Sequence, residues 1–199
     1  MGCFKKILQI IILAFALIGF FSIGGKEWVV DLYNKYMSSS KEAVMERASK
    51  IADFSGLSDE YSIDKAASAF GYQGVLAEHE ASGQKMIIVD TGKKPVITEA
   101  DFKNGTVDAK MQDFLKKFKY QSLQVDDFTI IKQGTMHAYN QQVPYVRFTA
   151  KINKLPIGQV GGIISAVDTG KNDSKMLISL NENKKYSQLI ADEFFRKVK

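Results

Sequence analysis

The chain has 199 residues, a single cysteine and a formal net charge of +5. One cysteine excludes an intramolecular disulfide, and the near balance of 27 basic and 22 acidic residues argues against a nucleic-acid-binding protein. A chain of this size can bury a core of its own, so its fold needs neither a disulfide nor a metal to hold it together.

The first element in chain order is an uncharged run over residues 7–25. As a helix, these residues reach about 28 Å, close to the ~30 Å hydrocarbon core of a bilayer. Lys5 and Lys6 precede the run, whereas a lysine–glutamate pair follows it, which favours a cytoplasmic N-terminus and export of the remainder. We therefore expect residues 1–6 to be cytoplasmic and residues 7–25 to be a single transmembrane anchor in the cell membrane.

A cleavable signal peptide is the alternative for this segment. The basic start and the small-x-small triplet at residues 22–24 are compatible with cleavage and secretion. The apolar run is longer than a signal core, however, which favours an uncleaved anchor. Cys3 precedes the apolar run, the wrong order for a bacterial lipoprotein, and we expect no role for it. An exported part without cysteines is typical of a bacterial envelope protein.

Residues 26–53 are expected to form a juxtamembrane helical segment that is interrupted by three serines at residues 38–40. Ser39 and Glu42 fit the S-x-x-E pattern of a capping box at the start of a second helix. Apolar residues with helical spacing follow and predict that this helix buries one side.

From Tyr61 the apolar period changes towards two, which is typical of strands. The Ser82–Gly83 pair predicts a hairpin between the first two of the runs. In one run, apolar residues alternate with Arg147, Thr149 and Lys151, which predicts one buried and one solvent-exposed sheet face. The predicted strands are Tyr72–Ala81, Gln84–Asp90, Leu123–Lys132, Val143–Ile152, Val160–Asp168 and Lys175–Asn181.

Two amphipathic helices are predicted among these strands, over residues 106–118 and 186–198. Each needs an apolar partner, and the buried sheet face is the natural one. No long linker divides residues 54–199, so we expect one extracytoplasmic domain there. The predicted fold class is α+β, with a mostly antiparallel sheet of five to seven strands packed by amphipathic helices.

A five-residue repeat is the sharpest chemical signal in the chain. Val-Asp-Thr-Gly-Lys occurs at residues 89–93 and again at residues 167–171. Hydrophobic-hydrophobic-Asp-Thr-Gly resembles the active-site motif of aspartic proteases, and the resemblance implies that Asp90 and Asp168 share a proton as base and acid. Three features oppose it: both copies continue with lysine, 78 residues separate them, which is tight for two lobes, and no apolar-apolar-Gly partner follows in matching positions. Asp-Thr-Gly is also ordinary turn chemistry at the end of a strand.

The two histidines, His79 and His137, are far apart in the sequence and have no cysteines to join them. Zinc needs three or four convergent ligands, so we predict no metal site and no cofactor. Glycines 158, 161 and 162 match no phosphate-binding loop and are expected to mark a bulge or a close crossing of backbones.

The functional expectation is a non-enzymatic, membrane-tethered extracytoplasmic domain that binds a protein or an envelope polymer. Two alternatives stay open. One is an aspartic-type peptidase that uses Asp90 and Asp168, and the other is an envelope protein that binds a small ligand or a lipid in an apolar pocket between sheet and helices.

Overall fold

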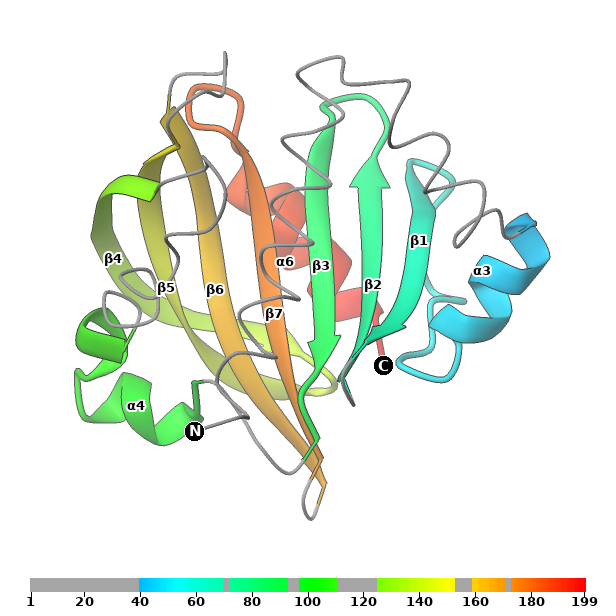
Figure 1. Ribbon diagram of the computed structural model, residues 1–199, viewed down its shortest axis with the longest axis horizontal. Coiled ribbons are helices and arrows are strands. Elements are labelled where there is room, and N and C mark those ends of the chain that lie inside the picture. Colours follow the sequence, from blue (N-terminus) through cyan, green and yellow to red (C-terminus); the bar gives the residue numbers. More distant parts are fainter. Residues whose placement is uncertain (1–39, 70–71, 93–96, 111–124, 153–158, 171–172) are drawn as a thin grey trace.

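The computed structural model describes residues 40–69, 72–92, 97–110, 125–152, 159–170 and 173–199. A seven-stranded sheet in the order β1-β2-β3-β7-β6-β5-β4 dominates these residues (Figure 1). Every strand pairs antiparallel with its neighbour, so the α+β class and the antiparallel sheet are confirmed. The strands are β1 (Tyr61–Ala69), β2 (Tyr72–His79), β3 (Gln84–Asp90), β4 (Val125–Ala138), β5 (Gln141–Ile152), β6 (Gln159–Gly170) and β7 (Asp173–Glu182). The helices are α3 (Lys41–Ala48), α4 (Glu99–Lys103) and α6 (Gln188–Lys197), and residues 107–110 are also helical.

Tight turns connect two of the strand pairs. Gly83 adopts a φ of +67° between β2 and β3, in the hairpin that the sequence predicts. Tyr139 and Asn140, with φ of +50° and +60°, form a two-residue turn between β4 and β5. Both residues lie in the left-handed region, which matches the right-handed twist of a hairpin.

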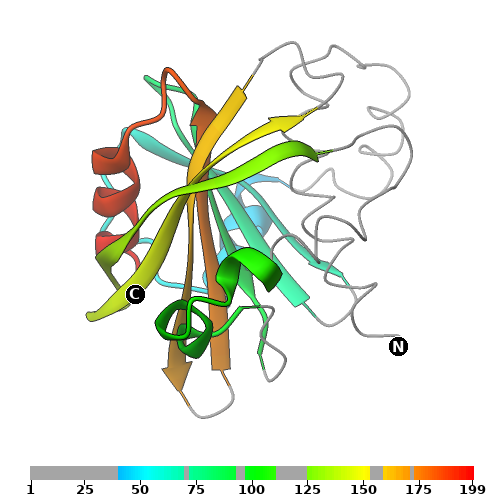
Figure 2. The same ribbon diagram turned by 90° about the vertical axis from the view of Figure 1, so that its left-hand side faces the viewer.

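The helix α6 covers one face of the sheet, which we call the α6 face (Figure 2). Its buried Ala191, Phe194 and Phe195 share a cluster with side chains from β2 to β7, among them Ile88 and Leu177. The opposite face, which we call the α4 face, is also buried. On it, α4 contacts β5 and β6, and its buried Phe102 lies outside the cluster formed with α6.

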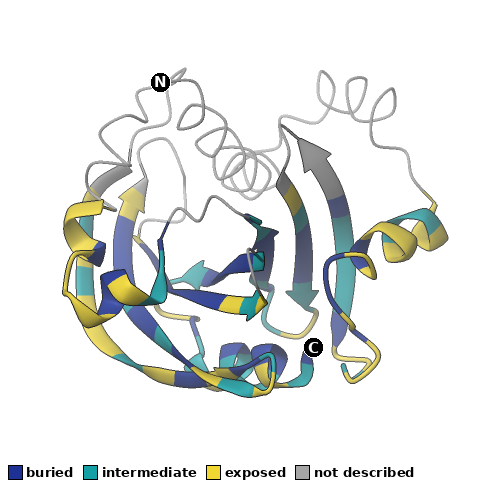
Figure 3. Cartoon of the chain, turned by 90° about the horizontal axis from the view of Figure 1, so that it is seen from below, coloured by how far each residue is buried: buried dark blue, intermediate teal, exposed yellow. Residues whose placement is uncertain are grey.

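The expectation of one buried and one solvent-exposed face is therefore wrong for this sheet. Eight consecutive residues of β6 and seven of β7 are buried, so both faces of these strands are covered (Figure 3). In β5, Val146 and Phe148 are buried on the α4 face, while Arg147 points to the α6 face and lies 4.8 Å above the ring of Tyr186. Arg147, which was expected to face solvent, thus packs against Tyr186 in the chain that leads into α6 and makes a cation–π contact with its ring.

A fully buried glutamine positions the start of α6. Gln84 has no exposed surface, and its Nε2 donates to Ser179 Oγ at 2.9 Å and to the carbonyl of Ser187 at 2.8 Å. Its Oε1 accepts from the Ser187 N–H at 2.8 Å. Because every polar group of this amide is satisfied, its burial stabilises the docking of α6 and does not oppose it.

Helix α3 packs beside β1, and the chain after it enters the α6-face core through Ala48, Ile51 and Phe54. Ser40 caps this helix by accepting from the Ala43 N–H at 3.3 Å, one residue later than the predicted cap.

A carboxylate with four donors fixes α4. Asp101 is 6% exposed, and it accepts from Thr98 N and Oγ1 (both 2.8 Å), from Thr106 Oγ1 (3.0 Å) and from Lys110 Nζ (2.6 Å). Burial opposes ionisation of this group, but the hydrogen bonds from Lys110, Thr98 and Thr106 outweigh it and lower the pKa of Asp101 to about 2. The ionised carboxylate therefore ties α4 to the helical turn at residues 107–110.

The expected close crossing of backbones is present at Gly162. A Cβ there would lie 2.3 Å from the Ser179 carbonyl oxygen. Strand β4, at the edge of the sheet, has register shifts after Asp126 and after Ile130, and Asp127 has a φ of +52°. These irregularities are typical of β-bulges.

Several sequence predictions lie outside the described residues: the cytoplasmic residues 1–6, the anchor at residues 7–25, the segment up to residue 39, the part of the helix 106–118 beyond residue 110, and the first two residues of the predicted strand Leu123–Lys132. No helix within the described ranges has the length and apolar character required to cross a bilayer.

Candidate functional site at the end of the sheet

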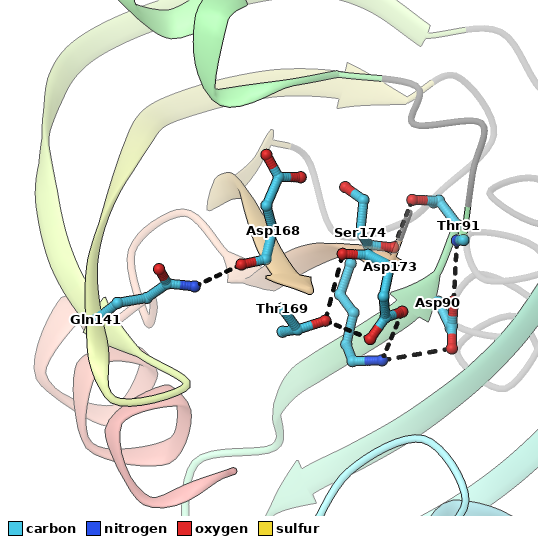
Figure 4. Close-up of polar contacts among 9 residues, drawn as sticks. Asp90, Thr91, Gln141, Asp168, Thr169, Asp173 and Ser174 are labelled. Atoms are coloured by element: carbon cyan, nitrogen blue, oxygen red, sulfur yellow. Dashed lines mark hydrogen bonds and ion pairs between the residues drawn. The ribbon is translucent and has the colours of Figure 1, made fainter. Parts of the chain in front are cut away.

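Both Val-Asp-Thr-Gly motifs lie at the same end of the sheet and flank the first residues of β7. Asp90 ends β3 and pairs with Lys175, while Asp168 lies near the end of β6 and pairs with Ser174. The two copies of the sequence repeat therefore lie near each other in the structure (Figure 4). We define this sheet-end cluster as Asp90, Thr91, Tyr139, Asp168, Thr169, Asp173, Ser174 and Lys175.

The two repeated aspartates do not meet. Strand β7 separates β3 from β6, and two spacings of about 4.8 Å put their backbones roughly 10 Å apart. Asp90 shares the α6 face with Lys175, whereas Asp168 shares the α4 face with Ser174, one register position away. The carboxylates consequently point to opposite sides (Figure 4). A dyad that shares one proton requires carboxyl groups in contact, and this arrangement does not supply it.

A buried ammonium group occupies the position beside Asp90. Lys175 is 6% exposed, and its Nζ lies 3.3 Å from Asp90 Oδ2 and 3.4 Å from Asp173 Oδ1. The same Nζ lies 6.0 Å from the ring centroid of Tyr139. Asp90 is thus one of two carboxylates that neutralise a buried lysine, which is a structural role.

The ring of Tyr139 lies beside the ion pairs that Lys175 forms with Asp90 and Asp173. Burial raises the pKa of the Tyr139 phenol far above its usual value, and the Asp90 and Asp173 carboxylates raise it further. Its hydroxyl is buried and has no hydrogen-bond partner. The phenol therefore stays neutral and contributes ring contact, not a proton.

The threonines of the repeat, Thr91 and Thr169, form hydrogen bonds to the first residues of β7. Thr91 donates to the Ser174 carbonyl from both its N–H (2.8 Å) and its Oγ1 (2.7 Å). Thr169 Oγ1 donates to Asp173 Oδ2 at 2.5 Å, and Gln141 Nε2 donates to the Asp168 carbonyl at 2.8 Å. These contacts hold three strand ends and the β4–β5 turn together, as expected for turn chemistry.

The sequence pattern did not indicate Lys175, Asp173 or Tyr139 as members of the cluster. The available signal was the lysine directly before the apolar run that starts at Met176, because a buried lysine requires a carboxylate partner.

The two histidines lie on different strands. His79, in β2, lies beside Tyr61 with the ring centroids 5.1 Å apart, and its Nδ1 lies 2.9 Å from Ser82 Oγ. His137, in β4, is exposed opposite Gln142. Among the described residues, no three histidine, cysteine, aspartate or glutamate side chains gather in a way that could hold a metal ion.

The chain matches no family model, and no curated protein matches it either.

Proposed function

We propose that this protein is a membrane-tethered binding domain that acts outside the cytoplasm on a protein or an envelope polymer, without catalysing a reaction. The observation that carries the proposal is the uncharged run over residues 7–25, which follows Lys5 and Lys6. In this proposal the run anchors the chain, and the sheet domain presents its surface to the partner.

The sheet-end cluster supports a binding role over a catalytic one. Its best chemical candidate, Asp90, is neutralised by Lys175, and the threonines that follow the aspartates are engaged with strand ends. The groups that would do chemistry therefore stabilise the fold, which leaves the outer surface to carry the function.

Basic side chains near α6 provide a surface for an acidic envelope polymer. Lys184 and Arg196 are exposed there, and the part of the chain after residue 25 carries a net charge of +3. Each lysine or arginine close to an anionic surface contributes up to about 1 kcal/mol to binding. The proposal thus favours a partner that carries negative charge.

Cysteine labelling in intact cells tests the topology. The wild-type chain has only Cys3, which the proposal places in the cytoplasm, and Asn104 is an exposed residue in the turn after α4. A membrane-impermeant maleimide should label Asn104→Cys in a Cys3→Ser background, and it should label the wild-type Cys3 only after lysis. Labelling of Cys3 in intact cells, or extraction of the full-length chain by carbonate, would overturn the anchor. A mature mass lacking residues 1–25 would show that the chain is released.

Crosslinking in intact membranes tests the binding role. An amine-reactive crosslinker should join the domain to one recurrent protein or glycan species. In a separate binding assay with purified envelope, the double variant Lys184→Glu/Arg196→Glu, added as free protein, should bind less tightly than wild type. The absence of a recurrent species together with unchanged envelope binding would contradict the proposal.

A further inference from the structure

Two positive charges lie directly opposite each other on the α6 face, at the edge of the sheet. Lys132 of β4 is the register partner of Arg147 of β5. Opposite residues of an antiparallel pair share a face, with Cβ atoms roughly 5 Å apart, and like charges in this position repel each other. A carboxylate beside the pair, or an anion from outside the chain, would remove this repulsion.

The described residues supply no carboxylate to the pair. Ion pairs between described residues involve other lysines and include neither Lys132 nor Arg147. Burial raises the pKa of the neighbouring Tyr186, Arg147 opposes this rise and Asp192 of α6 adds to it, so both charged groups lie near that ring. Asp192 Oδ1, however, accepts from Gln188 Nε2 at 3.1 Å. In the described part of the chain, the two cations therefore have no neutralising partner.

The guanidinium of Arg147 has a fixed support. It lies 4.8 Å from the centroid of the Tyr186 ring, which is 9% exposed. Arg147 is itself partly buried, and none of its N–H groups donates to another described residue. A guanidinium offers its N–H groups as a rigid fork that fits two oxygens of one oxyanion. The stacked Arg147 is thus held in place while its hydrogen-bonding capacity stays available.

A third basic residue lies beside this pair. Lys184 precedes Tyr186 by two residues, is exposed, and forms no ion pair with a described carboxylate. Lys132 is also exposed, so its ammonium group can reach a ligand from the side of β4. Three cations therefore surround the Tyr186 ring, and the charge of this surface is complementary to an anion.

We propose that Arg147 and Lys132 bind a phosphate group of a negatively charged envelope polymer. The fork of Arg147 takes two oxygens of the group, and Lys132 contacts it from the neighbouring strand. A tetrahedral phosphate directs its oxygens out of one plane, so it can meet both cations, whereas the guanidinium fork alone satisfies a planar carboxylate. Lys184 lies ready for the next charge along the polymer. The source of the phosphate rests on the proposed function, whereas the oxyanion site itself rests on the geometry.

Calorimetric titration of the full-length chain in a non-ionic detergent with long-chain inorganic polyphosphate tests the site. Arg147→Gln and Lys132→Gln should each weaken binding about tenfold, because each removes a charge-assisted contact. Arg147→Lys keeps the charge but loses the fork, and it should weaken binding by about threefold or more. The matched control is Lys50→Gln, which removes an exposed charge near β1, at the other edge of the sheet, and should change binding by less than about twofold.

The exposed Lys132 keeps the test decisive if the Arg147 variants fail to fold. No binding of polyphosphate by wild type, or equal effects of Lys132→Gln and Lys50→Gln, would overturn the site. Binding of polyglutamate as tight as that of polyphosphate would overturn the choice of phosphate. Binding to phosphatidylglycerol vesicles without binding to polyphosphate would overturn the polymer in favour of a lipid.

Purified envelope separates the site from the proposed function. Reduced envelope binding by Lys132→Gln, with Lys50→Gln unchanged, supports both. Wild-type envelope binding that Lys132→Gln leaves unchanged would overturn this site and leave the binding role intact. Polyphosphate binding that Lys132→Gln weakens, with no binding of wild type to envelope, would support the oxyanion site and contradict the proposed function.

Discussion

Asp101→Asn tests how much one buried carboxylate stabilises the α4 segment. The pKa of Asp101 falls from 3.8 to about 2 on folding, because the donors from Lys110, Thr98 and Thr106 outweigh the cost of burial. At 1.36 kcal/mol per pKa unit, this shift corresponds to about 2 kcal/mol of folding free energy at pH 7. The asparagine keeps the shape of the side chain but turns one acceptor into a donor, which then faces another donor.

The pH dependence distinguishes this mechanism from simple loss of packing. Because the folded-state pKa lies below the unfolded value, the stabilisation is complete above about pH 5 and is lost as the pH falls towards 2. The difference in unfolding free energy between wild type and Asp101→Asn should thus be about 2 kcal/mol at pH 7 and about half of that at pH 3.

Urea denaturation at the two pH values measures this difference. Glu99→Gln is the matched control, since it removes a first-turn carboxylate of the same helix that accepts none of these hydrogen bonds, and it should change stability by less than about 1 kcal/mol. A difference for Asp101→Asn that is the same at pH 7 and pH 3, or below about 0.5 kcal/mol at both, would refute the reasoning.

Three further predictions concern the core and the sheet-end cluster. Lys175→Met should destabilise the protein by about 3 kcal/mol in chemical denaturation, because it leaves the Asp90 and Asp173 carboxylates without their shared ammonium group. Lys185→Met removes an exposed ion pair and should cost under about 1 kcal/mol. Similar losses for the two variants would contradict the structural role of the buried Lys175. Gly162→Ala should cost about 2–3 kcal/mol, since its Cβ would lie 2.3 Å from a carbonyl oxygen of β7. Gly74→Ala should be far milder, because its Cβ would lie 3.7 Å from the Ile88 carbonyl oxygen; a neutral Gly162→Ala would contradict the close crossing. Gln84→Met should cost about 1–3 kcal/mol and increase hydrogen exchange in α6 first, and uniform exchange across the domain would argue against its anchoring role.

Much of the sheet could be predicted from local pattern. The run from Gln84 to Asp90 is a strand with the bounds that its composition predicts, and the Ser82–Gly83 turn is where the hairpin requires it. Other strands extend further than predicted: β4 continues to Ala138, because polar residues at an edge strand still pair with their neighbour. Helix α4 was not predicted, since five residues are too few to show a helical period.

The burial of both faces could not be predicted from alternation alone. Arg147 and Thr149 read as solvent-facing, yet the first lies against Tyr186 and the second is 7% exposed. Alternation reports which positions share a face, but a long polar side chain can be covered by a partner distant in sequence.

The position of the repeated motif could not be predicted in full. The resemblance implied that Asp90 and Asp168 meet; the structure places both at one end of the sheet, but their faces depend on the register of β7 between them. A shift by one residue reverses the face, and the register of β7 against β3 is set by pairs as far apart in the chain as Asp90 and Lys175. The ion pair between Asp90 and Lys175 could not be predicted from the sequence for the same reason.

The irregular edge strand has a consequence for association between copies of the domain. At high concentration, a long straight edge would template strand-by-strand growth into fibres. The bulges in β4 and the left-handed Asp127 make this edge irregular, so that it is a poor template for a further strand. We therefore expect neighbouring molecules to remain separate at densities that would polymerise a regular sheet.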